Sequence, residues 1–150
     1  MQAVCRSVVT VAALVALGTG TASAYGVDLG TLPPESIQGD VKYITGGVGS
    51  DEAEAMRQAA SRYPLAIELA ARASPRAAYV ANVTIDIRDT HGRTVLSTTT
   101  DGPFLLASLP PGRYTINAQL EGQSQQKTVA IGNGAHQHVM FEFAVDVAER

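Results

Sequence analysis

Apolar and polar side chains alternate along much of the second half of the chain, a pattern typical of half-buried β-strands. The clearest run is 79–88, where the residues expected to face inward are Tyr79, Ala81, Val83, Ile85 and Ile87. A second alternating run has inward positions at Tyr114, Ile116, Ala118 and Leu120. Between the two runs, Phe104 to Leu109 is apolar on both faces, which predicts the most deeply buried strand.

Shorter runs of the same kind complete the pattern. They predict further strands at Leu65–Ala70, Val95–Thr100, Lys127–Ile131 and Val139–Phe143, with Val41–Thr45 as a candidate first strand. In Leu65–Ala70 only the face with the larger side chains is expected to be buried. Short strands separated by polar turns are typical of a sandwich. We therefore predict a mainly β fold, a single seven-stranded β-sandwich domain over residues 41–145.

One segment has helical periodicity. Its apolar positions, spaced to share one helix face, are Ala53, Met56, Ala60 and Tyr63. Asp51, three residues before Glu54, suits a capped start, Arg62 suits the last turn, and Pro64 ends the segment. The sequence therefore predicts one short amphipathic helix over residues 51–62, placed before the core of the sandwich.

Glycine-rich residues 46–49 precede this helix, and such a turn can bind phosphate through free backbone N–H groups. The order G-G-V-G matches neither common nucleotide fingerprint, and no lysine follows it. Asp51, Glu52 and Glu54 also place negative charge at the positive end of the helix. A capped helix without a bound anion is the favoured interpretation.

The first 24 residues have the parts of a secretory signal peptide. A basic residue, Arg6, precedes the apolar run Val8–Leu17, and small residues lead to A-S-A ending at Ala24. This run is shorter than the roughly 20 residues that span a bilayer, so an uncleaved anchor is disfavoured. We predict cleavage after Ala24 and a periplasmic or secreted protein. Residues 25–40 are expected to form a flexible arm, and residues 146–150 a frayed tail.

Composition narrows the classes of partner. The predicted mature chain of 126 residues contains ten basic and fourteen acidic residues, a net charge of −4, with no basic cluster. This argues against nucleic acid and against an anionic membrane surface as partners. The single cysteine, Cys5, lies in the predicted signal peptide, so the mature domain must be stabilised by packing alone.

The turns carry a family resemblance. Its signature positions are Asp89, Gly92, Thr100, Asp101, Phe104, Leu109, Pro110, Gly112 and Tyr114. In this order they resemble the carboxypeptidase regulatory-like domain, a prealbumin-like β-sandwich found beside enzymes and in many exported bacterial proteins. The resemblance implies a fold but no reaction. The loop after Asp101 is shorter than in the family, which predicts a shortened hairpin, and Tyr114 is expected to be a core residue with a bonded hydroxyl.

Enzymatic functions are disfavoured by the motifs. The transthyretin-like fold includes hydroxyisourate hydrolases, whose carboxy-terminal Y-R-G-S element does not occur here, where the last strand ends F-E-F-A-V-D. The sequence also lacks a G-x-S-x-G elbow and an H-E-x-x-H motif. We therefore expect no catalytic activity and no cofactor.

A metal site is one alternative. In the predicted last strand, period-two alternation places His136, His138, Met140 and Glu142 on one face. Imidazole and thioether groups suit copper, and imidazole also suits zinc. The competing interpretation is a solvent-facing strand whose outward residues are polar.

A second alternative, a carbohydrate-binding module, would need exposed aromatic side chains. The chain has no Trp, and its Tyr and Phe residues fall mostly on predicted core faces. The favoured interpretation is a non-catalytic, exported module that binds an envelope protein, because sandwiches have edge strands to which a partner strand can pair.

Overall fold

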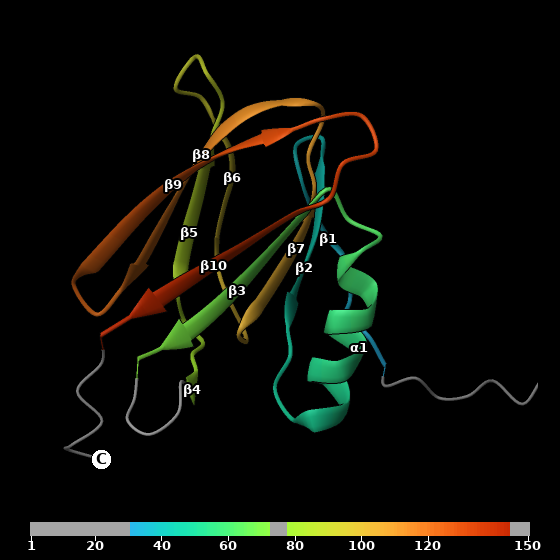
Figure 1. Ribbon diagram of the computed structural model, residues 1–150, viewed down its shortest axis with the longest axis vertical. Helices are drawn as coiled ribbons and strands as arrows, with labels where there is room; N and C mark the ends of the chain where they lie inside the picture. Colours follow the sequence, from blue (N-terminus) through green and yellow to red (C-terminus); the bar gives the residue numbers. More distant parts are fainter. Residues whose placement is uncertain (1–30, 73–77, 145–150) are drawn as a thin grey trace, which may run out of the picture.

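The structure, a computed structural model, describes residues 31–72 and 78–144. These residues form one helix, α1 (Ser50–Ala60), and ten strands (Figure 1). The strands are β1 (Ser36–Gln38), β2 (Val41–Gly46), β3 (Leu65–Ala71), β4 (Ala78–Tyr79), β5 (Thr84–Arg88), β6 (Thr94–Thr99), β7 (Phe104–Ser108), β8 (Gly112–Leu120), β9 (Gln123–Ile131) and β10 (Gln137–Phe143). The prediction of a mainly β fold with one helix is confirmed, whereas the count of seven strands is wrong.

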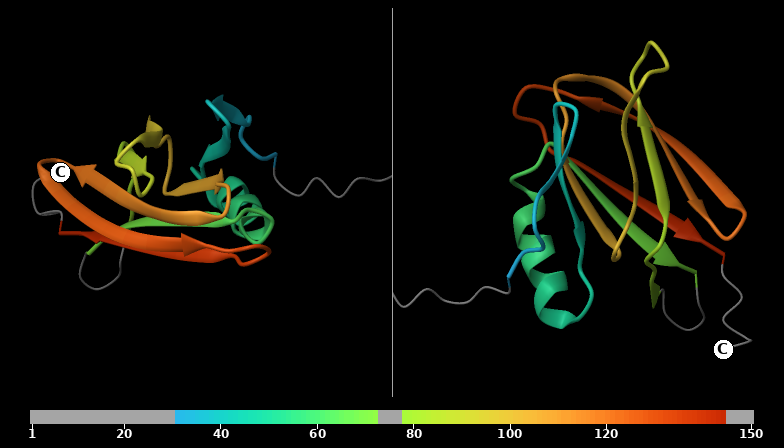
Figure 2. Two further views of the ribbon diagram at one scale, coloured as in Figure 1. Left: turned by 90° about the horizontal axis from the view of Figure 1, so that it is seen from above. Right: turned by 180° about the vertical axis from the view of Figure 1, so that it is seen from behind.

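Two sheets pack against each other. The first sheet has the order β1-β2-β7-β3-β10, with the short β4 also paired to β3, and the second has the order β6-β5-β8-β9. The paired strands are antiparallel except β3 and β10, which run parallel. The view from behind in Figure 2 shows α1 lying beside β2. The fold is therefore a β-sandwich with one added helix.

The core between the sheets uses most of the side chains that the alternation predicts. Ile85, Ile87, Ile116 and Ala118 are fully buried there, together with Leu105 from β7. β7 lies between β2 and β3 in the first sheet, and its residues from Phe104 to Ala107 are all buried. The prediction that this segment is buried on both faces is confirmed for Phe104 to Ala107, and β3 is buried to a similar extent.

The helix covers the outer face of the first sheet. Met56 and Ala59 pack there against Ile44, Phe104 and Leu106 in a second apolar cluster. Because the helix is present, β3 buries residues on both faces instead of the single face predicted. No helix within residues 31–72 and 78–144 has the length and apolar character needed to cross a membrane.

The bounds predicted for the helix are shifted. The helix begins at Ser50 rather than Asp51, its N-cap is Gly49, and no side chain caps it by a hydrogen bond. Asp51 therefore lies inside the first turn. Arg62 lies beyond the last turn, where the basic residue is Arg57.

The predicted long strand 79–88 is divided between the two sheets. β4 pairs with β3 in the first sheet, and β5 pairs with β6 and β8 in the second. Asn82 has φ 59° between them, and its N–H donates to the Thr100 carbonyl at 2.9 Å. The hydroxyl of Thr100, which is fully buried, accepts the Val83 N–H at 3.2 Å. These bonds hold the crossing, and as a result Tyr79 is 50% exposed instead of buried in the core.

The segment 100–103 is also a crossing between sheets and not the predicted shortened hairpin. β6 belongs to the second sheet, whereas Phe104 at the start of β7 lies opposite Gly46 and Glu68 in the first. The short loop after Asp101 carries Gly102 directly against the backbone of Gly46. Two sheets meet closely at this point.

Two local predictions are confirmed, the turn at Asp89 and the buried, hydrogen-bonded Tyr114. Asp89 accepts N–H groups from its own turn, and Gly92 has φ 76°. Tyr114 is 7% exposed, and its hydroxyl donates to the Pro110 carbonyl at 2.7 Å. β9 is longer than predicted because it pairs with β8 along its whole length.

The prediction of a flexible arm over residues 25–40 is wrong for residues 36–38, which form β1 against β2. The predicted signal peptide and the predicted tail 146–150 lie outside the described residues.

Candidate functional site

On one side of the sandwich, β6 at an edge of the second sheet faces β1 and β2 at the edge of the first sheet, and we call this boundary the seam. A pocket lies at each end of the seam. A pocket of about 780 Å³, the helix pocket, is lined by Gly47, Val48, Gly49, Ser50, Asp51, Ala53, Glu54, Arg57, Tyr79, Val80, Ala81 and Pro103. A pocket of about 420 Å³, the turn pocket, is lined by Gly39, Asp40, Val41, Asp89, Arg93, Thr94, Val95, Pro110 and Tyr114. The end of β2 therefore leads to the first pocket and the start of β6 to the second.

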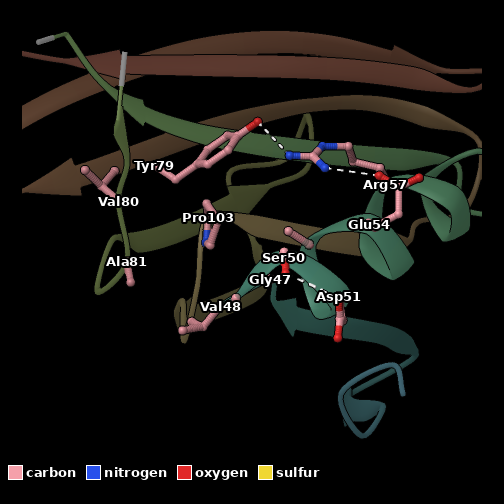
Figure 3. Close-up of a pocket in the computed structure, with 12 residues that line it drawn as sticks. Gly47, Val48, Ser50, Asp51, Glu54, Arg57, Tyr79, Val80, Ala81 and Pro103 are labelled. Carbon is pink, nitrogen blue, oxygen red and sulfur yellow. Dashed lines mark hydrogen bonds and ion pairs between the residues drawn. The ribbon is translucent and has the colours of Figure 1, made fainter. Parts of the chain in front are cut away.

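The helix pocket gathers exposed apolar side chains (Figure 3). Val48 is 65% exposed and Tyr79 is 50% exposed. Within the described part of the chain only two other large apolar residues are exposed, Ile37 and Met140. Half of this exposed apolar group therefore lies on one pocket, which is the kind of surface that marks an interaction site.

Arg57 forms a charged and hydrogen-bonded wall of the helix pocket. One guanidinium nitrogen donates to the Tyr79 hydroxyl at 3.1 Å, and another pairs with Glu54 Oε2 at 3.3 Å (Figure 3). The guanidinium carbon lies 5.7 Å from the ring centroids of both Tyr79 and Phe104, within range of cation–π attraction. The hydrogen bond to Tyr79, with the attraction to Glu54, raises the pKa of Arg57, so this group stays charged.

The glycine-rich loop beside the helix is occupied by a carboxylate from its own helix. Glu52 Oε1 accepts the N–H groups of Gly47 at 2.6 Å and Val48 at 3.3 Å. These donors are the ones a phosphate would require. Asp51 adds a second carboxylate, which accepts a hydrogen bond from the Ser50 hydroxyl at 3.3 Å. The charge at this end of the pocket therefore disfavours an anionic ligand.

A side chain bridges the middle of the seam. The Gln38 amide oxygen accepts the Ser97 N–H at 2.5 Å, and the amide nitrogen donates to the Ser97 carbonyl at 3.3 Å. Nearer the helix pocket, the Asp101 N–H donates to the Thr45 hydroxyl at 3.0 Å. The edge of β6 is thus covered by a side chain and not by another strand.

The turn pocket contains the Asp89 carboxylate, which is held by hydrogen bonds. Asp89 Oδ1 accepts N–H groups from His91 at 2.9 Å and Arg93 at 3.0 Å, and Oδ2 lies 3.1 Å from the Arg93 guanidinium. Desolvation by itself would raise the pKa of Asp89, but these bonds outweigh it and lower the pKa. Burial, and then the charge of Asp89, raises the pKa of Tyr114.

This carboxylate predicts a specific pH dependence. The pKa of Asp89 in the folded chain lies below its ordinary value of 3.8, so its stabilisation is present above that pH and is lost as the pH falls further. Urea unfolding from pH 7 to pH 2 should show wild type more stable than Asp89→Asn at neutral pH, with the difference shrinking in acid. The exposed Asp101→Asn is the matched control. A wild-type advantage that stays constant down to the lowest pH would contradict the prediction.

The residues of the metal hypothesis are only partly brought together. His138, Met140 and Glu142 share the outer face of β10, whereas His136 precedes the strand. His136 Nδ1 lies 2.8 Å from the Tyr63 carbonyl, and His138 Nε2 lies 3.1 Å from Glu68 Oε2. Glu142 pairs with an arginine, Arg72, at 3.5 Å. Among the residues that the structure describes, no group of three or more His, Cys, Asp or Glu side chains could hold a metal ion.

The edge formed by β10 is closed by side chains of β9. Gln123 pairs with both backbone groups of Ala144, accepting its N–H at 3.1 Å and donating to its carbonyl. Gln125 donates to the Glu142 carbonyl, and Lys127 donates to the Met140 carbonyl at 2.5 Å. These contacts occupy backbone acceptors along the edge that a partner strand would use.

Sequence reasoning missed most of these residues. Tyr79 was assigned to the core, and the signal for its exposure was Asn82, a residue type that tolerates positive φ and breaks the strand. For the closed β10 edge the signal was the polar run at the start of β9, where three inward positions carry Gln123, Gln125 and Lys127. Gln38 gave no signal, because its partner is 59 residues away.

Comparison with known proteins identifies no family. No family model matches the chain, and no curated protein matches it. Among solved structures, the Bacillus anthracis TIE protein matches with 14% identity and a TM-score of 0.41, over 53% of this chain and 16% of that one. The fold and the site together define a two-sheet β-sandwich with one packed helix and a pocketed seam.

Proposed function

We propose that this chain is an exported, non-catalytic module of the carboxypeptidase regulatory-like type, and that it binds an envelope protein through the helix pocket. The observation that carries the proposal is the exposure of Val48 and Tyr79 on one pocket of about 780 Å³. Interaction sites commonly combine an apolar centre with a polar rim, and here Asp51, Glu54 and Arg57 form the rim.

The polar groups of the pocket support binding more than catalysis. General acid–base chemistry needs a titratable group that is free to reach a substrate. Here Arg57 is held by Glu54 and Tyr79, and Glu52 is held by the loop. The signal-peptide pattern of residues 1–24 supports export to the periplasm or beyond, where such a module would meet its partner.

Site-specific photo-crosslinking in the native cells tests this proposal. A photoreactive residue in place of Val48 should trap one envelope protein reproducibly. The same residue in place of Gln119, an exposed position of β8 in the second sheet, is the matched control and should trap that protein at a several-fold lower yield. Equal labelling from both positions, or no specific product from Val48, would contradict the proposal.

A further pair of variants distinguishes binding in the helix pocket from nonspecific binding to exposed apolar side chains. Tyr79→Ala removes an exposed ring and should reduce the crosslinking from Val48 several-fold while the protein stays folded, since half of the ring surface already faces solvent. Met140→Ala, which removes an exposed apolar side chain outside the pocket, should leave the yield unchanged.

A further inference from the structure

Each of two edge strands is closed by a glutamine amide from the opposite sheet. Gln38 of the first sheet pairs with Ser97 of β6, and Gln123 of the second sheet pairs with Ala144 just after β10. A primary amide has one donor and one acceptor side, as a peptide unit does. Each glutamine therefore makes the two bonds that a neighbouring strand would make to the same residue.

The two closures differ in how firmly they are held. Next to Ala144, Gln125 and Lys127 also bond the β10 edge, and all three side chains come from β9, which pairs with β8 over nine residues. On β6 itself Gln38 acts alone, from the three-residue β1, whose residues are all exposed and which pairs only with β2; the seam bond from the Asp101 N–H to Thr45 lies beyond the end of β6. Displacing β1 breaks few contacts, so the β6 edge is the one that can be opened.

Pockets that could hold side chains of a bound segment lie near both ends of β6. The turn pocket includes Thr94 and Val95 at the start of β6, and the helix pocket includes Pro103, four residues after the end of β6. β6 has six residues, which extend over about 20 Å at roughly 3.4 Å per residue. A partner segment paired along β6 would begin beside the turn pocket and end at the segment 100–103, which leads to Pro103 in the helix pocket.

We infer that the partner binds by strand addition: an extended segment of it pairs with the β6 edge, and Gln38 occupies that edge until the segment displaces it. This inference rests on the proposed function and names how the same partner reaches the helix pocket. The segment forms backbone hydrogen bonds with Ser97 and with Thr99, which presents its backbone groups on the same side of the strand. Because Gln38 competes with the segment, the free protein binds more weakly than one without this side chain.

A peptide copying residues 93–99 serves as an extended probe of known sequence. Its binding to the wild-type protein and to the Gln38→Ala variant is followed by the chemical shifts of the protein's own Ser97 and Thr99 amides. Because the variant has lost two competing hydrogen bonds, it should bind the peptide about 10-fold more tightly. The same peptide carrying an N-methyl group at every residue should not bind, since the backbone donors of both of its edges are blocked.

Two further variants make the test specific. Gln123→Ala opens the other glutamine closure and should leave peptide binding at β6 unchanged. Gln38→Glu keeps an acceptor for the Ser97 N–H but loses the donor, so its affinity should lie between those of wild type and Gln38→Ala. This second substitution at the same position also gives a result if Gln38→Ala does not fold.

The following outcomes would contradict the inference. Equal affinity of wild type and Gln38→Ala, or binding of the N-methylated peptide, would exclude strand addition at β6. Self-association of Gln38→Ala in sedimentation, without peptide, would assign the edge to a second copy of this chain. Crosslinking from Val48 that persists while the peptide fails would remove strand addition and leave the proposed partner contact in place.

Discussion

Replacing Gly102 with alanine is expected to lower the free energy of unfolding by about 3 kcal/mol. A Cβ at this position would overlap the carbonyl group of Gly46, with the Gly46 Cα only 2.9 Å away. The obstruction is backbone, so no side chain can rotate away to relieve it. The two sheets would have to separate where the crossing 100–103 meets β2, and urea unfolding would measure the loss.

Gly132→Ala is the matched control for this substitution. The nearest atom to a Cβ at Gly132 is the Ala135 Cβ at 3.8 Å, an ordinary van der Waals contact. We expect the free energy of unfolding to change by less than about 0.5 kcal/mol. If Gly102→Ala were as mild as Gly132→Ala, the close approach of Gly102 to Gly46 would be wrong.

Replacing Phe141 with alanine is expected to cost about 4 kcal/mol of unfolding free energy. Phe141 is fully buried between the sheets, on the edge strand β10, and the cavity left by its ring would be lined by the rest of the core. Thermal and urea unfolding would both report the effect, and the variant should unfold at a clearly lower denaturant concentration.

Met140 provides the control on the same strand. It points to the opposite face and is 38% exposed, so Met140→Ala should cost much less than Phe141→Ala. The pair of variants tests the register of β10 directly, because a shift by one residue would exchange the two side chains between core and solvent. Equal costs for the two substitutions would contradict the parallel pairing of β10 with β3 in its present register.

Local pattern predicted the strands best where one face meets the core and the other meets solvent. β8 is such a strand, with Tyr114, Ile116, Ala118 and Leu120 buried as the alternation predicts. The Asp89 turn was predictable for a similar reason, because its hydrogen bonds join residues at most four apart. In both cases the determining interactions lie within one element or one turn.

The candidate site could not be predicted in the same way. Tyr79 continues the apolar alternation of the following strand, yet it belongs to another sheet and is half exposed. The helix pocket joins the loop 47–49 and the start of α1 to the segment 79–81 and to Pro103, which are distant from that loop in sequence. Period-two alternation states which side chains share a face, but it does not state which sheet the strand joins.

The sequence by itself determined the class of fold, the single helix, most of the buried positions and the residues of the tight turns, because these follow from local periodicity and backbone preference. Only the tertiary structure decided which strands share a sheet, where the chain crosses between sheets, and which edges are closed by glutamine side chains. Those features depend on contacts between segments far apart in the sequence, such as Gln38 with Ser97, 59 residues away, and Leu65 with Gln137 in the paired strands β3 and β10. Such contacts form only when the two sheets pack, so the pocketed seam is a property of the packed sandwich and of no single segment.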